Sequence, residues 1–208
     1  RLHGGSILVD THCDTILEVM RGKRSLGVRS TLGHLDFPRL REGGVGAQFF
    51  AIYIEPDYKP DRGLERALEV LDRLYSEVET YPDQAEVALN VADIRRIAKA
   101  GKVAVVIAIE GGEAIGHDMA NLRILYRLGV RSIGLVWNQR NLIADGVGER
   151  RTGGGLTNFG VAVVKETQPA QSLVVGSRVS DIPGIRDDLD GGELRSRHRR
   201  AAVAGRII

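Results

Sequence analysis

The chain has 208 residues, of which 43% are hydrophobic and 27% charged, so it can bury a core as one domain but is too short for two large ones. Its 29 basic and 27 acidic residues give a net charge of +2, which is too balanced for a strong field toward nucleic acid. A single cysteine excludes a disulfide-rich secreted scaffold, and neither a ~20-residue apolar run nor a secretory pattern over residues 1–15 is present, so we expect a cytoplasmic protein without a membrane segment.

Short apolar runs alternate with stretches of helical apolar spacing along the first 166 residues. In chain order, these predict a strand over 6–9, helices over 16–20 and 35–41, a strand over 45–54, helices over 61–81 and 91–100, a strand over 103–109, a helix over 119–128, a strand over 130–137 and a helix over 157–166. The longest helix has Asp61 as its expected N-cap and Pro82 just beyond its end. Because two of the strands are apolar throughout, the pattern indicates an α/β fold of βα units around a parallel sheet covered on both faces.

Two segments depart from this rhythm. Residues 146–155 are rich in glycine and are expected to form a mobile loop at the carboxyl end of the sheet. From Thr167 onward the chain carries scattered proline, glycine and aspartate, and only residues 173–175 resemble a strand. An arginine-rich tract covers residues 195–200. We therefore expect residues 1–166 to form the ordered part, and residues 167–208 to be an aberrant, disordered segment.

Polar residues at the carboxyl ends of parallel strands point into the functional crevice of such folds. His12 and Asp14 follow the first strand and, being two apart in an extended segment, leave the same face, while Cys13 points the other way. An imidazole and a carboxylate converging there suit a divalent metal. The alternative is structural: His12 would bond a backbone carbonyl and Asp14 would cap the following helix.

Two further strand ends carry polar groups. Glu110 follows seven apolar residues and precedes two glycines, so its carboxylate needs a metal, a pairing partner or solvent, and the glycines would let a ligand approach the backbone. Trp137 and Asn138 follow the fourth strand and would either shape a substrate pocket or cover the end of the sheet. We expect the remaining histidines, His3, His34, His117 and His198, to be solvated.

Three short sequence motifs occur in order: VDTHCD at 9–14, DFPRLREGGVGAQFF at 36–50 and IEGG at 109–112. Together they resemble the membrane (renal) dipeptidase family of zinc metallopeptidases. Supporting words are LRILYRLGVR at 122–131, WN at 137–138 with ADG at 144–146, and GLTNFG at 155–160. The resemblance runs from about Ile7 to Glu166.

The resemblance implies a (β/α) barrel of the metal-dependent hydrolase type with two zinc ions. His12 and Asp14 would hold one zinc, and Glu110 would bridge both. A hydroxide held by the metals would attack the peptide bond of a dipeptide. The chain has room for about four to five βα units, so the barrel is expected to be incomplete, and a homodimer is possible in such a family.

Two departures from the family pattern bear on this expectation. Trp137 stands where the animal enzymes have a histidine that polarises the substrate carbonyl, so we assign no catalytic side chain. After Glu166 the words that supply the second zinc's two histidines, a substrate-binding arginine and an acidic residue are absent, and a frameshift near Thr167 would explain this. The alternatives to a zinc dipeptidase are an inactive remnant of the family, or another barrel metallohydrolase that acts on amides or lactones.

Overall fold

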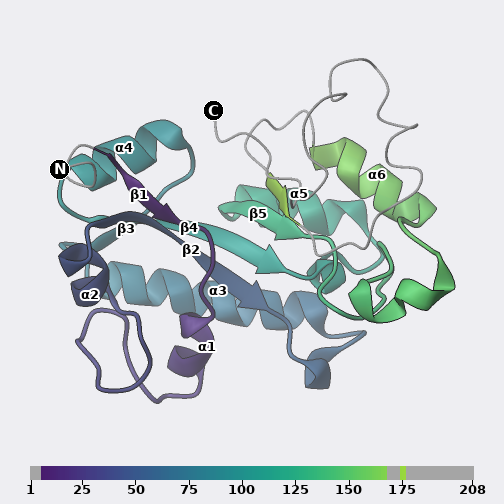
Figure 1. Cartoon of the computed structure of the whole chain (residues 1–208), viewed down its shortest axis with the longest axis horizontal. Coiled ribbons are helices and arrows are strands. Elements are labelled where there is room, and N and C mark those ends of the chain that lie inside the picture. Colours follow the sequence, from purple (N-terminus) through teal and green to yellow (C-terminus); the bar gives the residue numbers. More distant parts are fainter. Residues whose placement is uncertain (1–5, 168–173, 177–208) are drawn as a thin grey trace.

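One parallel sheet contains all the strands of the residues that this computed structural model describes, 6–167 and 174–176 (Figure 1). The strands are β1 (Leu8–Asp10), β2 (Val45–Tyr53), β3 (Ala85–Val87), β4 (Val103–Glu110), β5 (Val130–Gly134) and β6 (Val174–Gly176). Their order is β1-β2-β4-β5-β6, and β3 pairs with β4. β3 lies beside residues 103–105 and β5 beside residues 107–109, so these two strands share one edge of β4 while β2 takes the other.

Helices connect the strands in the expected βα alternation. They are α1 (Thr15–Met20), α2 (Phe37–Glu42), α3 (Gly63–Thr80), α4 (Val91–Lys99), α5 (Met119–Arg127) and α6 (Asn158–Thr167), with short 3-10 helices η2 (Pro56–Tyr58), η3 (Gly112–Ile115) and η4 (Val147–Thr152). The predicted α/β fold is confirmed, with five βα units before β6. Within the described residues β1 and β6 end the strand order, and β3 pairs with β4 alone. No helix of this part of the chain combines the length and apolar character needed to cross a membrane.

Two element boundaries and one strand are the main differences from the sequence prediction. α3 begins at Gly63 with Arg62, not Asp61, in the N-cap position. β5 ends at Gly134 rather than at 137, because the Leu135 carbonyl turns away to accept hydrogen bonds from the Gly112 N–H at 3.1 Å and the Asn141 side chain at 2.8 Å. β3 was not predicted, since a strand of three residues leaves no periodic pattern to detect.

The larger core lies between the sheet and α1, α2 and α3. Phe50 of β2 meets Phe37 of α2 edge to face, with ring centroids 6.2 Å apart. Ile107 of β4 is fully buried in the same cluster, as are Val70 and Leu74 of α3. This burial follows from the three-and-four spacing of apolar residues along α3, which places one apolar stripe against the sheet.

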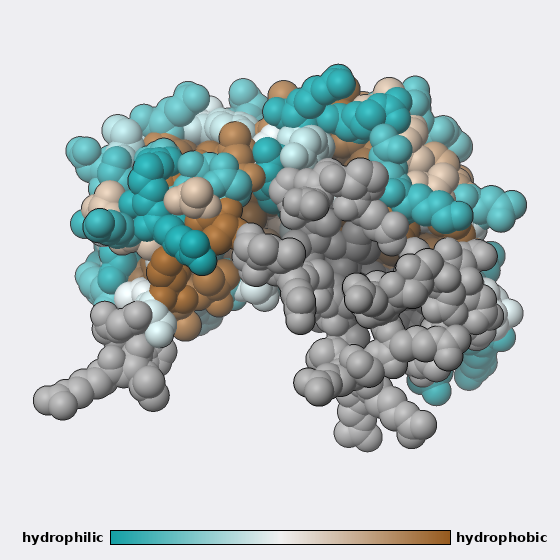
Figure 2. Space-filling view, turned by 90° about the horizontal axis from the view of Figure 1, so that it is seen from above, coloured by the Kyte–Doolittle hydropathy of each residue, from teal (hydrophilic) through white to brown (hydrophobic). Residues whose placement is uncertain are grey.

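The opposite face of the sheet holds a smaller core near the amino ends of the strands. Ala47 and Phe49 of β2 pack there with Ala104 and Val106 of β4, and Ile97 of α4 covers them. α3 and α4 therefore lie on opposite faces of the sheet (Figure 1). Viewed from the side of β1 and α4, apolar side chains reach the surface between hydrophilic ones (Figure 2). α4 therefore covers the amino end of this face, and the polar residues at the strand ends lie at its carboxyl end.

Candidate metal centre

The link between β1 and α1 carries His12 and Asp14 on one side and Cys13 on the other. The Cys13 carbonyl accepts a hydrogen bond from the Ala51 N–H at 2.9 Å, which holds this link beside β2. The Cys13 side chain packs against the larger core. Its burial raises the pKa of the Cys13 thiol to about 12, so the thiol stays neutral near pH 7 and is poorly suited to bind a metal.

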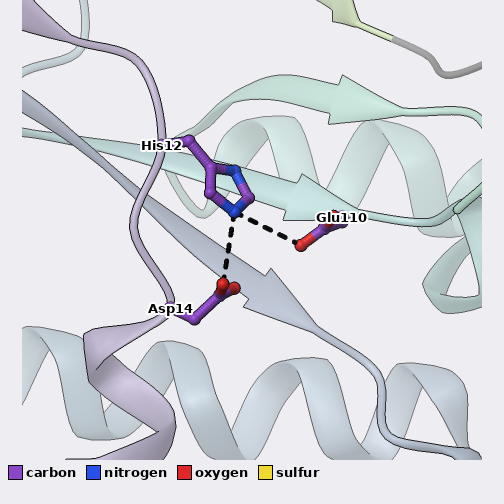
Figure 3. A group of neighbouring side chains, drawn as sticks. All are labelled: His12, Asp14 and Glu110. Atoms are coloured by element: carbon purple, nitrogen blue, oxygen red, sulfur yellow. Dashed lines mark hydrogen bonds and ion pairs between the residues drawn. The ribbon is translucent and has the colours of Figure 1, made fainter.

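His12, Asp14 and Glu110 point toward one another (Figure 3). His12 Nε2 lies 3.3 Å from Asp14 Oδ2 and 3.7 Å from Glu110 Oε2. One ligand atom from each of the three residues lies within 4.8 Å of the other two. The side chains of His12 and Asp14 are 52% and 55% exposed, and that of Glu110 is 22% exposed. Asp14 occupies the N-cap position of α1, but its side chain makes no capping hydrogen bond, so it is directed to this cluster instead.

This donor set fits a divalent cation. An imidazole nitrogen and carboxylate oxygens are ligands of Zn²⁺, which binds them at roughly 2.0–2.2 Å. The 4.8 Å span lets one ion reach all three residues. Two carboxylates set against one imidazole repel each other, and a cation would relieve that repulsion. Three protein ligands would leave a position for water or substrate, as in catalytic rather than structural zinc sites.

Tyr53 and Trp137 form an aromatic wall beside this cluster. Tyr53 ends β2 in register with Glu110 of β4, so the two side chains leave the same face of the sheet at the same level. The rings of Tyr53 and Trp137 meet edge to face with centroids 5.3 Å apart. Burial raises the pKa of the Tyr53 phenol, and the negative charges of Glu113 and Glu110 raise it further. The phenol is therefore a neutral hydrogen-bond donor near pH 7.

The glycine-rich segment after β5 packs against the loop that carries Trp137 and Asn138. The Gly148 N–H donates to the Asn138 carbonyl at 2.7 Å, and a Cβ at Gly146 would lie only 2.5 Å from that carbonyl. Hydrogen bonds from Arg140 and Thr152 lower the pKa of Asp145 to about 2, and the Thr152 bond ties this segment to the residue that precedes it. Part of the segment expected as a mobile loop thus forms η4 and is held by these contacts.

Sequence reasoning anticipated some of these residues and missed others. Tyr53 was not singled out, although it satisfies the rule that selected Glu110, because it too is a polar residue at the carboxyl end of an apolar strand. Gly112 serves packing rather than ligand approach, since a Cβ there would meet Ile143 Cδ1 at 2.2 Å. His34 and His117 are exposed, as expected. His3, His198 and the tract at 195–200 lie outside the described residues, as does nearly all of the segment expected to be out of frame.

Comparison with known proteins agrees with the resemblance seen in the sequence. Residues 1–182 match the membrane dipeptidase family, peptidase family M19. The dipeptidase verJ of Clonostachys rogersoniana is 30% identical over 72% of this chain, and the dipeptidase tcpJ of Claviceps purpurea is 32% identical over 72%. The crystal structure of dipeptidase AC, a metallopeptidase of family M19, matches 81% of the chain with a TM-score of 0.72 and 26% identity. The probable dipeptidase PvdM of Pseudomonas aeruginosa shares the fold, with a TM-score of 0.76 over 87% of the chain at 20% identity.

The match covers only part of each relative. The chain spans 41% of the length of verJ and 37% of tcpJ. It covers 55% of the dipeptidase AC chain and 49% of PvdM. The family match nevertheless includes most of this chain, with every residue of the His12 cluster and every described strand inside it. The chain therefore belongs to the membrane dipeptidase family.

Proposed function

We propose that this chain carries the first metal-binding half of a zinc-dependent dipeptidase, with His12, Asp14 and Glu110 as metal ligands. The observation that supports this most is their convergence within 4.8 Å at the carboxyl end of the sheet. Parallel barrel enzymes place their catalytic groups at that end. The family match supplies the reaction class, because curated relatives of this chain are named dipeptidases.

Each ligand is supported by its own element. Asp14 is fixed by the first turn of α1, where the Leu17 N–H donates to its backbone carbonyl at 3.0 Å. Glu110 ends β4, whose pairing with β2 and β5 on both edges limits its movement. The His12 N–H donates to Asp10 Oδ1 at 3.2 Å, which restrains the backbone of the third ligand. Ligands fixed in this way lose little conformational freedom when a cation binds.

A divalent metal bound by these residues would lower the pKa of a coordinated water and polarise a substrate carbonyl. Around it, the chain's own side chains would bind and orient a dipeptide. Trp137 and Tyr53 offer an apolar wall for a substrate side chain, and the neutral Tyr53 phenol can donate a hydrogen bond to a carbonyl or carboxylate oxygen. We assign Trp137 and Asn138 to the substrate pocket, and we propose that the substrate is a dipeptide.

The test begins with the purified full chain. Bound zinc is measured per chain, and dipeptide hydrolysis is assayed with and without a chelator. The His12→Ala and Glu110→Gln variants should lose bound zinc, whereas His117→Ala, which changes an exposed histidine outside the cluster, should keep it.

The outcomes separate the competing interpretations. About one tight zinc per chain that disappears in His12→Ala would support the metal centre. Zinc binding without dipeptide turnover would mean that the chain holds the first metal but lacks the groups needed for catalysis. Turnover of amides or lactones but not of dipeptides would identify a different barrel hydrolase. Less than one tight zinc and no turnover would contradict the proposal.

A further inference from the structure

A buried ion pair joins the loops that follow β2 and β4. Lys59 follows η2 and Glu113 lies in η3, with Lys59 Nζ 2.9 Å from Glu113 Oε1. Their side chains are only 13% and 7% exposed. Taking two charges out of water costs about as much as their attraction returns, so such a pair adds little net stability. What it contributes depends on the groups that it contacts on either side.

On one side the pair contacts the aromatic wall. Lys59 Nζ lies 5.0 Å from the centroid of the Tyr53 ring, in the arrangement of a cation–π contact. The same ring meets Trp137 edge to face at 5.3 Å. Lys59 thus holds Tyr53 through one contact, and Trp137 holds it through another. The orientation of this ring, and with it the direction of the phenol, depends on where the ammonium group lies.

On the other side the pair contacts the backbone behind a metal ligand. Glu113 Oε2 lies so close to Gly111 that a Cβ on Gly111 would be only 2.2 Å from it. Gly111 also has φ +90°, a backbone conformation that favours glycine. Gly111 directly follows Glu110. The backbone carbonyl of Glu113 also lies against Gly63 at the start of α3, where a Cβ would come within 2.6 Å. Glu113 is therefore packed between α3 and the backbone that carries Glu110.

We propose that Lys59 and Glu113 are positioning residues of the metal centre, and that their ion pair fixes both the Tyr53–Trp137 wall and the backbone behind Glu110. The proposal rests on the assignment of Glu110 as a metal ligand. The pair joins the loops that follow Tyr53 of β2 and Glu110 of β4, so it holds the wall ring and the proposed ligand relative to each other. Neither Lys59 nor Glu113 needs to contact the substrate, because each acts through the residue that it holds.

A single neutral substitution leaves the other charge buried without its partner, whereas a double substitution removes both charges. The variants are Lys59→Met, Glu113→Gln and the double variant Lys59→Met/Glu113→Gln. Lys59→Arg serves as the conservative variant, since it keeps a cation near Tyr53. The control is Arg96→Met/Glu86→Gln, which removes an exposed ion pair that also joins two elements, α4 and β3. This control should behave as wild type.

Three measurements are made on each full-length variant. Trp137 is the only tryptophan of the chain, so its fluorescence emission reports on the wall directly. Zn²⁺ affinity is measured by competition with a chromophoric chelator, and stability by the thermal unfolding midpoint. We expect both single variants to shift the emission and to weaken Zn²⁺ binding about tenfold, the scale seen when groups that orient metal ligands are changed. Lys59→Arg should retain most of the wild-type emission.

The double variant decides between positioning and simple structural support. We expect it to recover the wild-type unfolding midpoint while its emission and Zn²⁺ affinity remain altered. A folded double variant with wild-type emission and wild-type Zn²⁺ affinity would overturn the proposal. If the wild-type chain binds no Zn²⁺, the metal assignment fails, and the positioning of the wall is then judged by the Trp137 emission alone.

Discussion

Two groups of charged residues in the described structure differ in what surrounds their carboxylates. Asp36 is fully buried, and its carboxylate accepts hydrogen bonds from the Ser30 N–H at 3.0 Å and from the Arg39 N–H and Nε at 2.9 Å each. Arg24 adds a contact at 3.3 Å. At the metal centre, Asp14 and Glu110 instead face the imidazole of His12. The first cluster surrounds one carboxylate with hydrogen-bond donors, and the second brings two carboxylates together around one imidazole ring.

This difference separates a group that holds the fold from a group that we propose to bind a cation. The donors around Asp36 come from the 24–30 loop and from α2, which its side chain also caps, so the carboxylate connects two parts of the chain. The carboxylate of Asp14 is 55% exposed and contacts the nearby His12, so its removal should cost little packing. We expect stability to depend on Asp36 and cation affinity to depend on the His12 cluster.

The largest effect is expected from Asp36→Ala. It removes a buried anion and leaves Arg24, whose side chain is only 2% exposed, without its carboxylate partner. Breaking a buried pair in this way costs about 3–5 kcal/mol of unfolding free energy. Urea unfolding followed by circular dichroism measures this loss. Glu42→Ala, which breaks an exposed pair with Arg29, is the control and should cost much less than Asp36→Ala. Equal losses of unfolding free energy in the two variants would contradict the prediction that the buried Asp36 contributes more than an exposed ion pair.

Metal affinity should show the reverse order. His12→Ala removes a ligand outright, so we expect Zn²⁺ binding to weaken by more than about 100-fold, beyond the 10–100-fold seen when only supporting groups are changed. The unfolding free energy of the metal-free chain should stay within ~0.5 kcal/mol of wild type, since the His12 side chain is half exposed. Calorimetric titration with Zn²⁺ and urea unfolding give the two values. A strongly destabilised His12→Ala chain would assign His12 to the fold instead.

The contribution of Asp36 to the free energy of unfolding should also depend on pH. Burial alone would raise the pKa of Asp36, but hydrogen bonds from Arg39 and Ser30 outweigh it and lower that pKa below its ordinary value. A carboxylate whose pKa is lower in the folded state stabilises the fold fully above its unfolded pKa, which is about 3.9 for aspartate, and loses that contribution as the pH falls through the folded value. The wild type should therefore lose stability below about pH 4 more steeply than Asp36→Asn. Parallel acid profiles of the two chains would refute this linkage.

Much of the fold could be predicted from the sequence because its signals are local. The apolar spacing of residues 61–81 and the continuous apolar run of 103–109 identify α3 and β4 without any knowledge of the sheet. β3 could not be predicted, since its three residues become a strand only by pairing with Val103–Val105. The end of β5 was misplaced because the chain turns at Leu135, whose carbonyl accepts hydrogen bonds from Gly112 and Asn141. These contacts form only in the folded chain and leave no local sequence pattern.

The candidate site divides in the same way. His12 and Asp14 were visible from their spacing in an extended segment, and Glu110 from its place after an apolar strand. The Lys59–Glu113 pair was not visible, because Lys59 lies in a loop and Glu113 in η3, and the two meet only through the pairing of β2 with β4. Candidate ligands at strand ends follow from the local sequence pattern, whereas the groups proposed to support them depend on three-dimensional contacts between distant segments.

The smallest expected effect concerns Trp137, which forms the wall together with Tyr53 and is not one of the proposed ligands. Trp137→Leu removes the edge-to-face contact with Tyr53, an interaction worth about 1 kcal/mol, and with it part of the wall. A dipeptide side chain that makes a contact of similar energy with Trp137 should then show a roughly fivefold higher KM. Zn²⁺ affinity should remain within about twofold of wild type, because the ligands keep their own supports. Trp137→Phe, which retains an aromatic edge, should fall between the two in KM. Steady-state kinetics with zinc titration checks both values, and a loss of Zn²⁺ affinity in Trp137→Leu would show that the wall and the metal ligands are one coupled unit.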